Sequence, residues 1–177
     1  MNTTIREMDE TTVQSVKQYG SSFEVTSKLV LHAENGKIHY TIIDVPPYRK
    51  QYGLERFDPE TYVSNPNRII FFAYVNDELA GQIRVSKNWN AYAYIHDIAV
   101  DEKYRGQGVG RALMERAIEW AKSQGFPGMM LETQDNNVAA CRFYERCGFE
   151  LCGFDTHLYK AMDPGTDEIA LYWYLMF

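Results

Sequence analysis

The sequence predicts an α/β fold in which a mixed, mostly antiparallel sheet is flanked by helices. Three observations support this class: short β-rich runs separated by turn signals, two helical patterns in the second half, and a chain that is 45% hydrophobic. No linker rich in Gly, Pro or Ser divides the 177 residues, and no internal repeat occurs. We therefore expect a single domain over residues 1–177.

The predicted strands of the first half are a short N-terminal strand and two hairpins. They cover Thr3 to Arg6, Phe23 to Leu31, Lys37 to Val45, Ile69 to Val75 and Leu79 to Val85. Asn35-Gly36 is a strong turn signal for the first hairpin, and Asn76-Asp77-Glu78 turns the chain in the second. Pro46-Pro47 is expected to stop the strand that precedes it.

Two short helices are also predicted in this half. A weak helix over Thr11 to Tyr19 would end at Gly20. Asp58-Pro59-Glu60 is typical of an N-cap, a proline at the first helical position and an acidic first turn. A helix is therefore expected over Pro59 to Ser64.

The second half begins with a strand over Tyr92 to Val100, followed by a helix that Gly125 closes. This helix has apolar residues at every fourth position, namely Val109, Leu113, Ala117 and Ala121. A strand over Gly128 to Thr133 comes next.

A second helix is expected to begin near Asp135 or Asn136, and Gly148 lies where a left-handed C-terminal cap belongs. Its apolar stripe is predicted to hold Ala140, Phe143, Tyr144 and Cys147. Two last strands, Phe149 to Thr156 and Ile169 to Phe177, are joined by a turn at Asp163-Pro164-Gly165.

The composition limits the class of partner. A formal net charge of −6 argues against a nucleic-acid binder and favours a small cationic partner. Three cysteines, no apolar leader and no apolar run of about 18 residues predict a cytoplasmic protein that binds no membrane. The four histidines are scattered, so no metal site is expected. A homodimer is left open.

A glycine-rich turn, Arg105 to Gly110, lies between a predicted strand and a predicted helix. Glycines let backbone amides curl around an anion, and the helix N-terminus adds unpaired N–H groups. A Walker A loop would need Gly-Lys-Ser/Thr where Gly110-Arg111-Ala112 stands, and a dinucleotide fingerprint would need Gly or Ala at Arg111 or Leu113. The alternative to an anion site is a tight turn without a ligand.

The pattern Arg105-x-x-Gly108-x-Gly110 resembles the acetyl-CoA pyrophosphate loop of the GNAT superfamily of N-acetyltransferases. Downstream, Asn137-x-x-Ala140-x-x-x-Tyr144-x-x-x-Gly148-Phe149 resembles that family's other cofactor segment. The resemblance covers the chain from about Arg68 onward. It implies a GNAT-like fold, with a cofactor-binding core at about 68–156 that uses acetyl-CoA as co-substrate and no metal.

Within this family, several segments resemble the streptothricin acetyltransferases. They are Lys87-Asn88-Trp89-Asn90, the strand Ala91 to Val100, the block Gly128 to Phe149, and Tyr172-Trp173-Tyr174 with the closing Phe177. This resemblance implies acetylation of an amino group on the β-lysine moiety of streptothricin-type antibiotics, and thus antibiotic resistance.

The predicted cofactor-binding residues take three roles. Backbone N–H groups of the glycine-rich turn would hold the pyrophosphate, with a charge-assisted contact from Arg105. The resemblance implies that Ile98 to Val100 align the pantetheine arm by main-chain hydrogen bonds and that Asn137 binds the pantetheine amides. The full set is Ile98, Ala99, Val100, Arg105, Gly106, Gln107, Gly108, Val109, Gly110, Arg111, Asn137, Ala140 and Tyr144.

Tyr144 is the candidate general acid, because the resemblance implies that it protonates the departing CoA sulfur. By its spacing alone it would be a core aromatic. Asn137 likewise has an alternative role near the helix N-terminus, which Asn136 or Asp135 could fill instead.

The general base is left open between Asp97 and Glu132, which lie on successive predicted strands. A structural salt bridge is the alternative for each, because sheet interiors rarely hold unpaired carboxylates. His96 precedes Asp97, and the two side chains face opposite ways unless a bulge intervenes.

A polycationic acceptor would need carboxylates and aromatic faces around it. The predicted substrate-binding residues are Trp89, Tyr94, Asp97, Glu132, Asp135 and Asp155. Two other functions stay open. One is acetylation of another amine, such as a polyamine, an aminoglycoside or a protein amino group, and the other is a non-catalytic acyl-CoA-binding sensor.

Overall fold

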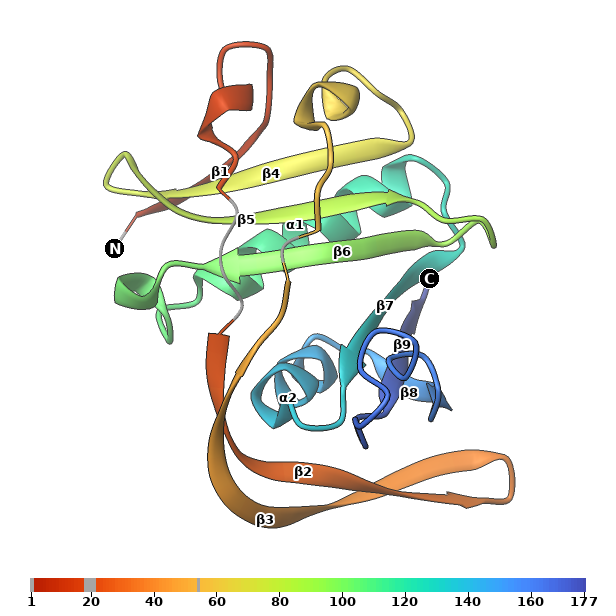
Figure 1. Ribbon diagram of the computed structural model, residues 1–177. Helices are drawn as coiled ribbons and strands as arrows, with labels where there is room; N and C mark the ends of the chain where they lie inside the picture. The colour runs from red at the N-terminus through yellow and green to blue at the C-terminus, as the bar shows by residue number, and fades with distance from the viewer. Residues whose placement is uncertain (1, 18–21, 54) are drawn as a thin grey trace. The chain divides into compact units, whose positions relative to one another are not determined.

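The computed structural model describes residues 2–17, 22–53 and 55–177 (Figure 1). It divides into two compact units, each built from separate stretches of chain. The first takes its described residues from Met1–Tyr19, Leu54–Met129 and Met176–Phe177, and the second from Gly20–Gly53 and Met130–Leu175. Helices and mainly antiparallel strands confirm the predicted α/β class. The single-domain boundary stays a prediction.

The first unit contains an antiparallel sheet whose strands pair in the order β1-β4-β5-β6 (Figure 1). Their bounds are Thr3–Glu7, Arg68–Val75, Glu78–Lys87 and Ala93–Val100. Asn76 and Asp77 turn the β4–β5 hairpin with φ values of 48° and 65°. Both are left-handed, as a tight hairpin turn requires, so the predicted hairpin is confirmed.

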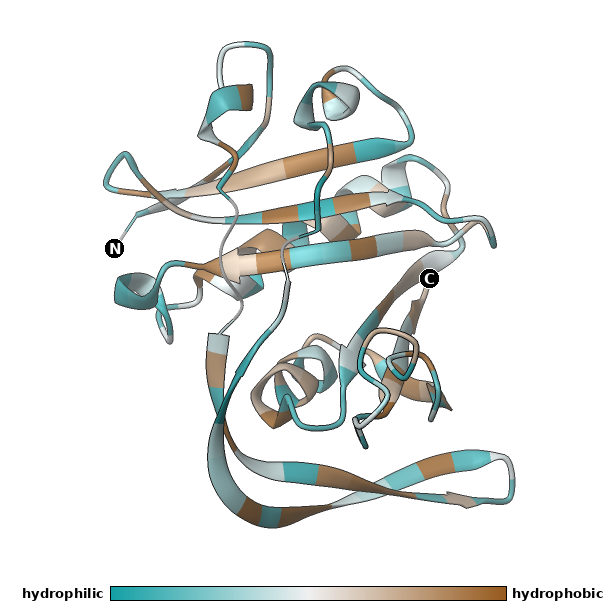
Figure 2. Ribbon diagram, viewed as in Figure 1, coloured by the Kyte–Doolittle hydropathy of each residue, from teal (hydrophilic) through white to brown (hydrophobic). Residues whose placement is uncertain are grey.

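Helix α1 (Val109–Ser123) packs against β4, β5 and β6 through the predicted apolar stripe. All four stripe residues are buried. Gly125 follows the helix at φ 75°, as expected of its C-terminal cap. Strand β5 alternates between the face toward α1, which holds Ile83, and the opposite face, which holds Gln82 and Arg84; Figure 2 shows this alternation of hydropathy.

The sheet face opposite α1 is covered by two short 3-10 helices, η1 (Val13–Ser15) and η2 (Pro59–Tyr62). A second apolar cluster lies there, comprising Met8, Tyr62, Ile70 and Phe72. This cluster fixes the two loop segments on the sheet, so both faces of the sheet are packed.

The prediction of a helix over Thr11 to Tyr19 was wrong for the described part, which holds only η1; its expected end at Tyr19 and Gly20 lies outside the described residues. The carboxylate of Asp9 accepts the backbone N–H groups of Thr11 and Thr12 at 2.9 and 3.0 Å. Such local side-chain bonds compete with helix formation.

The predicted helix at Pro59 is the 3-10 helix η2, and the expected cap is confirmed. The carboxylate of Asp58 accepts the Glu60 N–H at 3.0 Å. The helix ends at Tyr62, because Val63 is extended and Ser64 has a φ of 51°.

Strand β6 carries a bulge at His96. Asp97 pairs with Arg84 of β5 and Ile95 pairs with Val85, so His96 is the additional residue between them. At a bulge, neighbouring side chains need not alternate between the two faces of the sheet. The bulge therefore removes the reason to expect His96 and Asp97 on opposite faces.

The second unit begins with a long hairpin, β2 (Ser22–Glu34) and β3 (Lys37–Gln51), that turns at Asn35-Gly36 as predicted. Pro46-Pro47 was wrongly expected to stop β3. The register shifts between Val25 and Ser27, opposite which the prolines lie, so neither proline has to donate a ladder hydrogen bond.

The rest of this unit is built on strands β7 (Gly128–Gln134), β8 (Glu150–Asp155) and β9 (Ala170–Met176), ordered β7-β9-β8, with helix α2 (Val138–Arg146). The predicted stripe on α2 was only partly right. The buried residues are Val138, Cys141 and Tyr144, whereas Ala140, Phe143 and Cys147 are half-buried. The helix also starts later than predicted, at Val138.

Within the described ranges 2–17, 22–53 and 55–177, no helix has the length and apolarity needed to cross a membrane.

Candidate functional site

The glycine-rich turn leads directly into α1. Gly106 and Gly108 have φ values of 73° and 85°, and Gly108 is the N-cap of the helix. The first helical bond runs from Ala112 N–H to the Gly108 carbonyl at 3.0 Å, so the amides of Val109 and Gly110 precede it and have no acceptor within the helix. A Cβ added at either glycine would meet open space. The turn therefore leaves room beside outward-facing amides, which suits a phosphate group.

The charged side chains of this turn already make local contacts. Arg105 Nε donates to the Val100 carbonyl at 3.1 Å, and its Nη1 lies 3.7 Å from Glu102. Gln107 donates to the Lys103 carbonyl at 2.8 Å, and Arg111 pairs with Glu115 at 2.8 Å. These contacts fix the shape of the turn while its basic side chains stay exposed.

The predicted pantetheine strand forms the C-terminal part of β6. Ile98, Ala99 and Val100 pair on one side with Ile83, Gln82 and Gly81 of β5. Gly81 is required there, because a Cβ at this position would lie 2.6 Å from the Ala99 carbonyl oxygen. The close approach of the two strands thus fixes the backbone of Ala99.

Asp97, a candidate base, lies in a buried polar cluster of the first unit. Its carboxylate accepts Gln82 Nε2 at 3.2 Å, and the same amide nitrogen donates to the Lys17 carbonyl at 2.8 Å. Burial raises the pKa of Asp97, while Gln82 and the Arg84 charge act in the opposite direction. The carboxylate is held by a side chain that also ties down the loop at Lys17.

Arg84 is the buried cation of the same cluster. It donates to the Tyr62 hydroxyl at 3.3 Å and to the Glu55 carboxylate, and its guanidinium lies 4.1 Å above the centre of the Phe57 ring. Its Nε has no hydrogen-bond partner among the described residues. Arg84 thus joins β5 to the segment that leads into η2.

The two aromatic residues predicted to bind substrate, Trp89 and Tyr94, differ in their surroundings. The ring of Tyr94 contacts the His96 ring at a centroid distance of 4.9 Å. Trp89 lies in the β5–β6 turn and is 92% exposed, so no described part of the chain packs over its ring.

Glu132, the other candidate base, lies on β7 in the second unit and is half-buried. The hydroxyl of Tyr159 donates a hydrogen bond to its carboxylate. Burial, and next the charge of Glu168, raises the pKa of Glu132 to about 7. A carboxyl group with this pKa exchanges a proton near neutral pH, as a general base requires.

Asp135 and Asp155, both predicted to bind substrate, each accept backbone hydrogen bonds. Asp135 is 3% exposed and accepts the Ile169 N–H at 3.1 Å. Asp155 accepts the N–H groups of His157 and Leu158 at 2.7 and 3.0 Å. Both carboxylates therefore shape the loop between β8 and β9.

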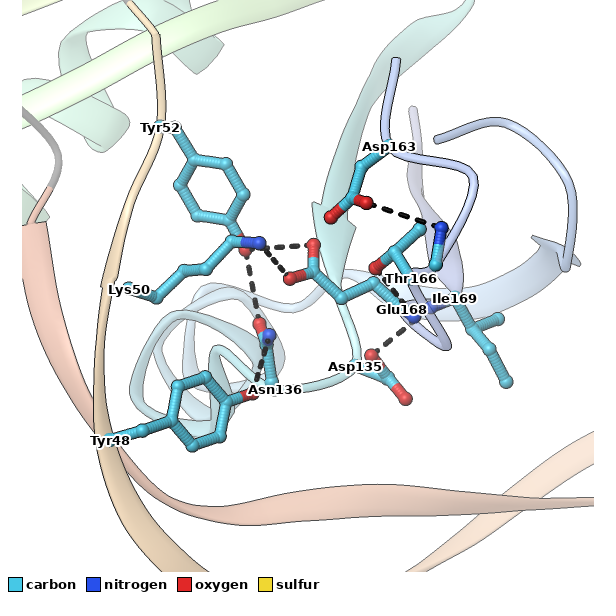
Figure 3. A network of polar contacts seen from close by, with 10 residues as sticks. Tyr48, Lys50, Tyr52, Asp135, Asn136, Asp163, Thr166, Glu168 and Ile169 are labelled. Carbon is cyan, nitrogen blue, oxygen red and sulfur yellow. Dashed lines mark hydrogen bonds and ion pairs between the residues drawn. The ribbon is translucent and has the colours of Figure 1, made fainter. Parts of the chain in front are cut away.

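Around Asn136 lies a polar network of the second unit (Figure 3). Tyr52 donates to Asn136 at 3.1 Å and to Glu168 at 3.4 Å, while Asn136 donates to the Tyr48 hydroxyl at 3.2 Å. Lys50 forms an ion pair with Glu168. The network joins β3 to the turn before α2 and to the segment before β9.

Tyr144 lies on the buried face of α2, 9% exposed, with its ring against Phe143 and Phe149 at centroid distances of 5.5 and 6.1 Å. Asn137 is the N-cap of α2, and its side chain accepts the Ala140 N–H at 3.3 Å. The capping role considered for Asn136 or Asp135 thus belongs to Asn137.

Sequence reasoning missed Gln82, Tyr159 and Glu168. Gln82 had one local signal, a polar residue within an otherwise apolar central strand. Tyr159 and Glu168 had none, because they lie in a loop and contact Glu132 and Lys50 only after folding.

No three or more His, Cys, Asp or Glu side chains among the described residues come together as a metal site would require.

Residues 38–149 match the model of the acetyltransferase (GNAT) family. The chain belongs to this family, whose fold and glycine-rich turn the structure contains. It is 40% identical to streptothricin acetyltransferase A of Bacillus subtilis (strain 168), over 98% of this chain and 99% of the relative. A streptothricin acetyltransferase of Escherichia coli is 37% identical over 86% of this chain and 84% of its own.

Among the solved structures that match over nearly the whole chain is that of a candidate streptothricin acetyltransferase from Bacillus anthracis in complex with acetyl coenzyme A. The two chains share 47% identity, superpose with a TM-score of 0.92, and match over 99% of this chain and 100% of the other.

Proposed function

We propose that this N-acetyltransferase transfers the acetyl group of acetyl-CoA to an amino group of a streptothricin-type antibiotic, on its β-lysine moiety, and so confers resistance. The observation that carries the proposal is the 40% identity with streptothricin acetyltransferase A over 98% of the chain. The structural match to a protein crystallised with acetyl coenzyme A supports the co-substrate.

The first unit is proposed to bind acetyl-CoA. The amides of Val109 and Gly110, at the positive end of the α1 dipole, would donate hydrogen bonds to the pyrophosphate, and Gly106 and Gly108 leave it room. The main chain of Ile98 to Val100 would align the pantetheine arm in the manner of an added strand.

Glu132 is proposed as the general base. The acceptor amine arrives mostly protonated and must lose a proton before its lone pair can attack. Glu132 has a pKa raised to about 7, so its ionised form can take that proton and release it near neutral pH. Asp97 remains the second candidate, although its carboxylate already accepts Gln82.

The base takes one proton from the ammonium group of the acceptor, and the freed amine nitrogen then forms a bond to the thioester carbonyl carbon. As the carbon–sulfur bond breaks, Tyr144 is proposed to give its phenol proton to the departing thiolate, which leaves as CoA thiol. The nitrogen then loses its second proton, which restores the Tyr144 phenol. The side-chain oxygen of Asn137 accepts the Ala140 N–H, and its remaining hydrogen-bonding groups are proposed to contact the pantetheine amides.

The acceptor is proposed to meet carboxylates and aromatic rings. Of the predicted residues, Asp97, Glu132, Tyr94 and Trp89 remain in this role, whereas Asp135 and Asp155 are already bonded to backbone amides. A multiply charged cation gains from such groups by ion pairing and cation–π contact.

We propose a cytoplasmic location, supported by the free thiols of Cys141, Cys147 and Cys152. The homodimer and the absence of nucleic-acid and membrane binding stay predictions.

Release of CoA thiol in the presence of acetyl-CoA tests the function across a panel of amines: streptothricin, a polyamine, an aminoglycoside and a peptide with a free N-terminus. We expect streptothricin to give the highest kcat/KM by at least tenfold. Faster turnover of another amine would identify that amine as the preferred substrate and overturn the proposal for streptothricin. Acetyl-CoA binding with no thiol release would indicate the sensor instead.

A further inference from the structure

The loop between β8 and β9 is shaped by aspartates along its length. Asp155 accepts two amides at its start, and Asp163 accepts the Gly165 N–H at 3.2 Å in its middle. At its end the Ile169 N–H donates to Asp135 at 3.1 Å (Figure 3). These bonds fix the backbone on both sides of Tyr159 and Glu168.

This loop brings two different groups to one carboxylate. The Tyr159 hydroxyl donates a hydrogen bond to Glu132, and the Tyr159 carbonyl in turn accepts the amides of Met162 and Asp163 at 3.0 and 2.9 Å. Glu168 brings a like charge close enough to raise the pKa of Glu132. A donor and a like charge act on a carboxylate in opposite directions.

Other ionisable groups face the same place from β3 and β9. Lys50 pairs with Glu168 and Tyr52 donates to it, so both act on Glu132 through Glu168. Tyr172 of β9 has a raised pKa, chiefly from burial and next from the charge of Glu132, with Asp155 contributing. Among the described residues, no hydrogen bond joins Tyr172 to Glu132.

We propose that Tyr159 is a positioning residue whose hydrogen bond favours the ionised, proton-accepting form of the Glu132 carboxylate. The charge of Glu168 acts against this effect of Tyr159 and keeps the carboxylate basic. The assignment rests on the proposed function, in which Glu132 takes the proton of the acceptor amine. It extends that function by naming the loop between β8 and β9 as the element that sets the protonation of the base.

The physical reason is that a base must be both ionised and strong. A phenol that donates to a carboxylate stabilises the anion, whereas a neighbouring carboxylate destabilises it. Removing the Tyr159 donor should therefore raise the pKa of Glu132, and removing the Glu168 charge should lower it. Opposite shifts from two residues of one loop would not follow from loosened packing alone.

The test is a pH titration of the Glu132 carboxyl carbon by NMR in full-length protein carrying labelled glutamate, without acceptor. The Glu132→Gln variant assigns the signal. We expect Tyr159→Phe to raise the Glu132 pKa by about one unit and Glu168→Gln to lower it by about one unit. Tyr48→Phe is the matched control, because it removes a phenol that bonds Asn136 and should leave the Glu132 titration unchanged.

The same variants are then assayed for kcat/KM against pH with streptothricin. The acidic limb of each profile should follow the Glu132 pKa that NMR gives for that variant. The raised pKa in Tyr159→Phe should therefore lower kcat/KM about fivefold relative to wild type at pH 7. An unshifted Glu132 titration in both variants, or an acidic limb that ignores the shifts, would overturn the proposal. If the titration shifts while wild-type protein fails to acetylate streptothricin, the positioning of Glu132 stands and the proposed substrate is wrong.

Discussion

The Ser86 hydroxyl lies 2.6 Å from Nε2 of His96. His96 is the bulged residue of β6, and its ring also contacts Tyr94. Burial, followed by the positive charge of Arg84, lowers the pKa of His96 to about 4. The folded protein therefore holds this imidazole neutral over a range in which an unfolded histidine gains a proton.

We expect acid destabilisation that depends on His96. Its folded pKa is depressed, so its neutral form stabilises the fold above the unfolded value of about 6.5, and this contribution is lost as the pH falls toward 4. Between pH 7.5 and 5, His96 should cost at most about 2 kcal/mol of unfolding free energy. Urea unfolding of wild type and His96→Gln at both pH values measures the difference.

The raised pKa of Glu132 makes stability change with pH in the opposite direction to His96. Its protonated form stabilises the fold, and this contribution is lost as the pH rises from about 4.5 to about 7. Comparing variants at each pH cancels this term. His32→Gln, on the exposed hairpin, serves as a control. An equal pH dependence in wild type and His96→Gln would contradict the prediction.

The glycine-rich turn should be sensitive to a single methyl group. Gly108→Ala places a side chain at φ 85°, which costs about 1–2 kcal/mol and is relieved if the turn leaves its anion-binding shape. The KM for acetyl-CoA should rise about tenfold. Gly125→Ala is the matched control, because Gly125 has φ 75° at the other end of α1 and open space beside it. It should lose similar stability and keep its KM.

Tyr144→Phe tests the proposed acid. The ring remains to pack against Phe143 and Phe149, so we expect little change in stability or in the KM for acetyl-CoA. Loss of the phenol proton should lower kcat by about 100-fold or more. Tyr74→Phe, which removes a hydroxyl from a ring packed against the apolar cluster of the first unit, should retain kcat. A kcat within threefold of wild type in Tyr144→Phe would remove this residue from the mechanism.

Asp97→Asn and Glu132→Gln separate the two candidate bases. Asn keeps an oxygen that can accept a hydrogen bond from Gln82, so Asp97→Asn should retain kcat. The loss of one negative charge should weaken binding of the cationic acceptor and raise its KM about fivefold. Glu132→Gln should lower kcat by about 100-fold and abolish the acidic limb of the pH profile. If neither variant changes acceptor affinity or turnover, the acidic acceptor site is to be abandoned.

Much of the fold was predictable because its signals are local. Asn35-Gly36, Asp58 and Gly125 act on their own backbone, and all three perform their predicted roles. The stripe from Val109 to Ala121 follows the helical repeat and is buried as expected. One error arose where distant packing overrides a local signal, at Pro46-Pro47, which lies opposite a register shift of its partner strand.

The sequence by itself determined the α/β class, the glycine-rich turn and the residues that carry the family resemblance, because backbone propensity and motif spacing are properties of contiguous residues. Only the tertiary structure decided which carboxylates are engaged in structural hydrogen bonds. Asp135 and Asp155 are bonded to backbone amides, and Glu132 meets a tyrosine 27 positions away. Whether a carboxylate acts as a structural ligand or as a base depends on partners that long-range packing supplies.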